Sequence, residues 1–266
     1  MKITAMCLCL FTAVATGSAA AQVSAEPWFR GGTWMLTVEV GGAAFTDFER
    51  TQARPVATEI DLGDFSRRVS ARTAGSVGGW GSYWIGNGWG IRAGAAYVPS
   101  SFTVWNDKTV RDALDTAAPP GSEEVSYASL DVWMAHAALV FRFPRSFGRV
   151  VPYGVAGGGL IRYHVSGDAE VPPEARGRFS EGDIQTGAGM FGVGATIPLQ
   201  RRNLLMSFEL TNHMSRTPLG QESAGELFEL YGVSMQVDPD PGTSGEYDVA
   251  MTSHVRLSLG LTLPLR

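Results

Sequence analysis

Apolar and polar residues alternate along several segments of this chain, and this alternation restricts its fold more than any other feature of the sequence. The last segment shows it most clearly: every second residue over 255–265 is Val or Leu, and Arg256, Ser258, Gly260 and Thr262 lie between them. Successive side chains of a β-strand point to opposite faces, so a period of two indicates a strand with one apolar face. The pattern therefore predicts an all-β fold.

The same alternation predicts eight strands, over residues 33–46, 73–86, 89–100, 126–143, 150–165, 184–198, 203–213 and 252–266. Two of the predicted apolar faces, Trp133 to Phe143 and Tyr153 to Tyr163, have aromatic residues at both ends. About ten residues separate such ends, which is the length that a tilted strand needs to cross a bilayer. We expect Tyr153 to Tyr163, like the other apolar faces, to point outward.

The connections between these strands are alternately short and long. Short ones, with Gly, Pro or Asn, are expected at 85–89, 144–149 and 200–203. Long polar ones are expected at 47–72, 100–125, 165–182 and 213–251, and they carry most of the 26 acidic residues. Short turns at one end and long outer loops at the other are typical of an antiparallel up-and-down transmembrane β-barrel.

The N-terminus has the features of a secretory signal peptide. Lys2 precedes a short apolar run over residues 3–14, and Ala19 to Ala21 offers a small-residue cleavage site. We expect three parts: a signal peptide at 1–21, a periplasmic segment at 22–32 and the barrel at 33–266. Both cysteines, Cys7 and Cys9, belong to the signal peptide, so the mature chain is predicted to lack disulfides and thiolate chemistry.

Composition excludes other classes of protein. The net charge is −5 and no basic cluster exceeds two adjacent arginines, which disfavours a nucleic-acid binder. No later segment contains 18 uninterrupted apolar residues, so a helical membrane protein is excluded. An exported chain with 33 glycines and only 18% charged residues fits a transmembrane barrel.

In this pattern of strands and loops, the mature chain resembles the small eight-stranded outer-membrane barrels of the OmpA-barrel, OmpX and OmpW group. The resemblance implies an outer-membrane location, with the barrel assembly machinery, outer-membrane lipid and lipopolysaccharide as partners, a monomeric state and no cofactor. It also implies a non-enzymatic role in structure, surface interaction or limited passage of small solutes. An exported soluble β-barrel that binds a ligand in its cup is the alternative from another class.

Charged residues on the faces opposite the apolar ones are predicted to point into the barrel. These residues are Glu39, Arg92, His136, Arg142, Arg162, His164, Glu209 and Arg256. Buried charges must be paired or solvated, so we expect an Arg/Glu network with trapped water that holds the barrel. Alternatively, the excess of arginine would favour anions along a narrow path. Asp238 and Asp240 suggest a calcium loop, but the ligand spacing does not continue, and we predict no metal site.

One local motif could carry chemistry. His213 and Ser215 are similar to the His-x-Ser stretch of outer-membrane lipid A 3-O-deacylases, in which the His acts as base on the Ser and a Glu orients the His. Here Arg216-Thr217 replaces the residues that follow the Ser in that family, and Glu226, Glu229 and Glu246 are only loose candidates for the Glu. The alternation also places His213 with Glu209 in the lumen. We therefore predict that the protein is not an enzyme, and keep this hydrolase as an alternative.

Overall fold

The computed structural model describes residues 26–46, 49–55, 65–86, 88–106, 124–144, 147–167, 182–199, 203–216, 227–230, 233–237 and 251–265. The predicted signal peptide, Asp238, Asp240, Glu226 and Glu246 lie outside these residues. The described part begins with the 3-10 helix η1 (Glu26–Phe29). It contains no helix that is long and apolar enough to cross a membrane.

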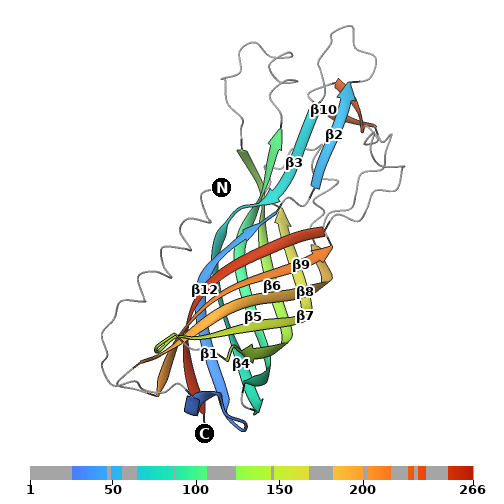
Figure 1. Ribbon diagram of the computed structural model, residues 1–266. Helices are drawn as coiled ribbons and strands as arrows, with labels where there is room; N and C mark the ends of the chain where they lie inside the picture. The colour runs from blue at the N-terminus through green and yellow to red at the C-terminus, as the bar shows by residue number, and fades with distance from the viewer. Residues whose placement is uncertain are drawn as a thin grey trace, which may run out of the picture.

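Among the described strands, eight close into an antiparallel barrel (Figure 1). They are β1 (Trp34–Phe45), β4 (Ala74–Gly86), β5 (Trp89–Asn106), β6 (Glu124–Arg142), β7 (Val151–Gly167), β8 (Gly182–Leu199), β9 (Leu204–Arg216) and β12 (Met251–Leu265). Each of them pairs with the next in the chain, and β12 pairs with β1 to close the ring. The predicted fold class is confirmed, and the predicted strands match these bounds to within a few residues, except that β5 continues to Asn106.

Four further strands form a sheet that projects from one end of the barrel, and we call this sheet the blade. It consists of β2 (Glu49–Pro55), β3 (Phe65–Ala71), β10 (Leu227–Leu230) and β11 (Val233–Val237). β3 pairs with the last residues of β5, β2 with β3, β11 with β2, and β10 with β11. The blade lies at the end of the barrel opposite the C-terminus (Figure 1). The sequence predicts loops in these segments, and this prediction is wrong, because the strands are short and lack a long apolar face.

The outer wall of the barrel is an apolar belt between two sets of aromatic residues. At the end near the C-terminus, the Trp34 and Tyr83 ring centroids are 4.8 Å apart, and Trp89 lies 5.9 Å from Phe141. At the blade end, the Tyr97 and Trp133 centroids are 4.5 Å apart. Between these aromatic girdles lie exposed aliphatic side chains, among them Leu36, Val38, Leu139, Leu160, Val193, Leu257, Leu259 and Leu261.

The face of β7 that points outward is the opposite of the one predicted. Tyr153, Ile161 and Tyr163 are buried in the lumen, and Arg162 and His164 lie on the outer wall. The register decides this orientation, because outward-facing Trp133 of β6 pairs directly with Arg162. The alternation gave the wrong face because residues 153–161 of β7 are apolar or small on both sides, and the charges of Arg162 and His164 suggest a lumen face.

Glycines on the lumen side allow β7 to lie close to β6. A Cβ atom on Gly157 would lie 2.1 Å from the carbonyl oxygen of Ala137, and one on Gly159 would lie 1.9 Å from that of Ala135. Both distances are too short for any side chain. The glycine run of this segment is thus explained by close backbone packing within the barrel wall.

Candidate functional site

Side chains fill the lumen in three layers. β6 runs from the blade end toward the C-terminal end of the barrel, and its buried, inward-facing residues give the order of the layers. Along the strand these residues are Leu130, Val132, Met134, His136, Ala138 and Val140. An apolar layer thus lies nearest the blade, a polar layer lies at the level of His136, and a second apolar layer follows.

The centre of the polar layer is an ion pair that crosses the barrel. Arg92 comes from β5 and Glu209 from β9, and three strands separate β5 from β9 in either direction around the ring. Arg92 Nη1 donates to Glu209 Oε2 over 2.5 Å, and Nη2 donates to Oε1 over 2.7 Å. This two-bond geometry is the strongest that a guanidinium and a carboxylate can adopt. The pair links two opposite walls of the lumen.

Two aromatic residues complete the surroundings of this pair. The Tyr153 hydroxyl donates to Glu209 Oε2 over 2.8 Å. The Arg92 guanidinium carbon lies 4.7 Å from the Trp80 ring centroid, within the range of a cation–π interaction. Sequence reasoning missed both residues, because neither an inward tyrosine nor an inward tryptophan is distinguishable from a membrane-facing one by alternation alone.

A second ion pair lies between the neighbouring strands β12 and β1. Arg256 Nη2 pairs with Glu39 Oε1, and the Ser258 hydroxyl donates to Glu39 Oε2 over 2.9 Å. The hydroxyl oxygens of Thr37 and Thr262 lie 2.6 Å apart in the same region. All five side chains are buried. Because both buried carboxylates have an arginine partner, the polar layer meets the requirement that buried charges be paired.

Three buried histidines extend the polar layer toward the blade. The His136 and His213 ring centroids are 5.8 Å apart. Nε2 of His254 lies 2.6 Å from the Tyr163 hydroxyl, which in turn lies 3.2 Å from Ser215 Oγ. Among the described residues, no group of three or more His, Cys, Asp or Glu side chains could hold a metal ion. His254 thus hydrogen-bonds across the lumen to β7, while the His136 and His213 rings pack against each other.

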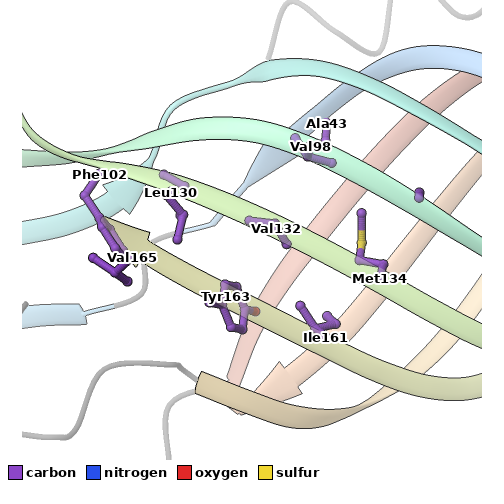
Figure 2. Close-up of a cluster of buried hydrophobic side chains, with 11 residues drawn as sticks. Ala43, Val98, Phe102, Leu130, Val132, Met134, Ile161, Tyr163 and Val165 are labelled. Atoms are coloured by element: carbon purple, nitrogen blue, oxygen red, sulfur yellow. The ribbon is translucent and has the colours of Figure 1, made fainter. Parts of the chain in front are cut away.

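The apolar layer nearest the blade consists of fully buried side chains from β5, β6 and β7. Val98, Phe102, Leu130, Val132, Ile161 and Tyr163 each have a relative exposure of 0%. Figure 2 shows them in one cluster, together with Ala43, Met134 and Val165. Side chains this deeply buried leave no surface for solvent.

The opposite end of the lumen is closed by residues of the N-terminal segment. Phe29 of η1 is buried against Trp84 of β4, with ring centroids 5.0 Å apart and an edge-to-face angle of 87°. Trp84 Nε1 donates to the sulfur of Met35, 3.3 Å away. The Arg142 guanidinium carbon lies 6.0 Å from the Phe29 ring centroid. The segment before the barrel thus packs into the barrel opening near the C-terminus and caps that opening.

The structure brings most of the predicted lumen residues together, but not all of them. Glu39, Arg92, His136, Glu209 and Arg256 are buried in the polar layer, and Arg142 lies half-buried near Phe29, beyond the second apolar layer. Arg162 and His164 do not belong to this group. Their side chains lie on the outer wall with exposed fractions of 57% and 48%, because β7 is oriented opposite to the prediction.

His213 and Ser215 share the lumen face of β9, and both are almost fully buried. Ser215 Oγ donates to the carbonyl oxygen of Arg216 over 3.1 Å, and its other close contact is the Tyr163 hydroxyl. A hydrolase needs its nucleophile within hydrogen-bond reach of its base and accessible to the substrate. Here the serine hydroxyl is engaged by other partners inside a packed lumen, and it does not face the outer wall.

No family model matches this sequence, and no curated protein is detectably similar to it. Comparison of structures finds similarity to the outer membrane protein OprG from Pseudomonas aeruginosa, with a TM-score of 0.46 and 15% identity over 88% of this chain and 97% of OprG. Outer membrane protein AlkL gives a TM-score of 0.45 and 13% identity over 94% and 97% of the two chains. Neisserial surface protein A gives 0.41 and 12% over 87% and 98%.

Proposed function

We propose that the protein is a non-enzymatic outer-membrane barrel with a sealed lumen, which anchors the blade and the long loops at the cell surface. The observation that carries this proposal is the packing of the lumen in three successive layers. A barrel whose interior is filled by fully buried side chains supports a structural or surface-interaction role better than solute passage. Glu209 and Glu39 neutralise the buried guanidinium groups of Arg92 and Arg256, so these arginines are not free to bind a passing anion. The ion pairs therefore also argue against an anion path.

The apolar belt supports a membrane location. A soluble monomer rarely exposes a contiguous apolar patch larger than a few hundred Å². Here exposed Leu, Val, Ile and Phe side chains occupy the wall between the two aromatic girdles, as in transmembrane barrels. This arrangement disfavours the soluble ligand-binding barrel. With short turns on the periplasmic side, both chain ends would lie in the periplasm and the blade outside the cell.

The blade supports the surface-interaction role. Among the described strands, β10 pairs only with β11, so its other edge has no neighbouring strand. A free strand edge presents a row of backbone donors and acceptors to which another extended chain can pair. The barrel would hold this edge beyond the membrane surface.

Wild-type protein reconstituted in a planar bilayer is expected to give no steady conductance, because fully buried apolar side chains such as Phe102 and Leu130 would block water in the proposed sealed lumen. The same preparation should migrate faster on a gel unboiled than boiled, which verifies that the closed barrel has formed. Conductance steps of reproducible size from such heat-modifiable protein would contradict the sealed lumen and favour solute passage.

Expression of the wild-type protein in a Gram-negative host is expected to leave the mass of lipid A unchanged, because Ser215 is engaged inside the lumen. Mass spectrometry of extracted lipid A provides the measurement. Loss of one hydroxyacyl chain with the wild-type protein, but not with Ser215→Ala, would show instead that the serine attacks lipid.

A further inference from the structure

The residues that the sequence wrongly assigns to the lumen form a polar cluster on the outer wall. Arg162 Nη2 donates to Asp183 Oδ2, and Nδ1 of His164 lies 2.9 Å from Asp183 Oδ1. Beside them, the Tyr97 hydroxyl donates to Asp131 Oδ1 over 2.6 Å. These contacts link β5 to β6 and β7 to β8 at the blade end of the apolar belt.

Arg162 of this cluster also belongs to a row of three side chains that carry hydrogen-bond donors and occupy neighbouring positions on three strands. Trp133 of β6 pairs in register with Arg162 of β7, and Arg162 pairs with Gln185 of β8. All three side chains are exposed on the outer wall. An indole, a guanidinium and a carboxamide all carry N–H donors, and the first two carry no acceptor. The row therefore suits a ligand that is rich in acceptor oxygens.

The row lies at the level of a membrane headgroup if the barrel spans the outer membrane as proposed. Trp133 belongs to the girdle at the blade end, since its ring packs on Tyr97. Aromatic girdles of transmembrane barrels lie at the boundary between hydrocarbon and headgroups. Arg162 would thus lie beside the headgroup layer, at the end of the barrel that would be in the outer leaflet.

Asp183 holds the guanidinium in place without using all of its donors. The carboxylate accepts from Nη2 of Arg162, and a guanidinium has five N–H groups in a fixed fork. With 57% of its side chain exposed, Arg162 retains donors on the open side. Because Asp183 already holds the Arg162 side chain in one orientation, less side-chain conformational entropy is lost when a ligand binds.

We propose that Trp133, Arg162 and Gln185, with Asp183 holding the arginine, bind the phosphate group of a phosphorylated glycolipid of the outer leaflet. The planar guanidinium fork matches the geometry of two phosphate oxygens. The flanking indole and amide add donors on either side. This proposal rests on the proposed outer-membrane location and specifies which lipid group contacts the barrel.

The test uses full-length mature protein refolded in detergent micelles, with bis-phosphorylated lipid A as the probe and native mass spectrometry as the readout. Arg162→Gln is expected to weaken lipid A binding about tenfold, because a charge-assisted contact is lost. Arg162→Lys should retain part of the affinity, since a point charge remains. The matched control is Arg72→Gln, which removes an exposed arginine at the same end of the barrel, between β3 and β4 and on the other side of β5 from the row on β6, β7 and β8.

Two further probes identify the source of the phosphate. Lipid A with both phosphates removed should bind the wild-type protein as weakly as intact lipid A binds Arg162→Gln. Inorganic phosphate should not displace intact lipid A, because it lacks the acyl chains that contact the apolar belt. Equal binding by wild type and Arg162→Gln, equal loss in Arg72→Gln, or displacement by inorganic phosphate would overturn the proposal. Heat-modifiable mobility of each variant separates these outcomes from a failure of the barrel itself to form.

Discussion

Glu209→Ala is expected to lower the free energy of unfolding by about 3–5 kcal/mol, because it leaves the buried Arg92 guanidinium without its carboxylate. The substitution also removes the acceptor of the Tyr153 hydroxyl. The measurement is urea-induced unfolding in liposomes, followed by tryptophan fluorescence. Among the variants considered, we expect this change to destabilise the lumen most.

A double variant tests whether the cost comes from the unpaired charge. Replacing both Arg92 and Glu209 with methionine removes both charges and keeps much of the side-chain volume. Replacement of a buried ion pair by apolar residues is often neutral or stabilising. The double variant should therefore be clearly more stable than Glu209→Ala. If Glu209→Ala unfolds at the wild-type urea concentration, the cross-lumen pair does not hold the barrel.

Leu259→Arg is expected to make the free energy of folding into a bilayer less favourable by about 2–4 kcal/mol, the cost of an arginine on the lipid face at the midplane. Leu259 lies on the outward face of β12, between Leu257 and Leu261, and its side chain is 43% exposed. Folding yield and urea titration in liposomes provide the measurement.

The matched control is Leu265→Arg, on the same strand and the same face. Leu265 pairs with Trp34 of the aromatic girdle near the C-terminus. An arginine there costs only about 0–1 kcal/mol, because its guanidinium can reach the membrane interface. Arginine at Ser258 is no neutral control, since that side chain is buried and donates to Glu39. Equal losses at 259 and 265 would argue against a membrane-embedded belt.

The sequence predicts the barrel well because alternation is a local property. Each strand of the barrel wall carries its own period of two, and turn residues mark its ends, so strand number, order and outward faces were predictable for most strands. The blade was not predictable. Its strands are only four to seven residues long, and β3 joins the barrel by pairing with the extended end of β5.

The candidate site was predictable only in part. Glu39, Arg92, Glu209 and Arg256 stand out as charges opposite clearly apolar faces, and they do lie in the lumen. Their pairing does not follow from the sequence, because Arg92 and Glu209 are 117 residues apart and meet across the closed ring. Tyr153 and Trp80 gave no signal, since their types occur on both faces of a membrane barrel.

β7 marks the boundary between what the sequence and the tertiary structure determine. The sequence by itself predicts an alternating strand over residues 150–165, and the observed strand is Val151–Gly167. It does not determine which face is inside, because the blade-side layer of this lumen is as apolar as the membrane-facing wall. Pairing with β6 and β8 fixes that choice for all seventeen residues at once, since a strand cannot rotate within its ladder. Only ring closure therefore decides that Tyr163 packs the lumen and that Arg162 lies on the outer wall.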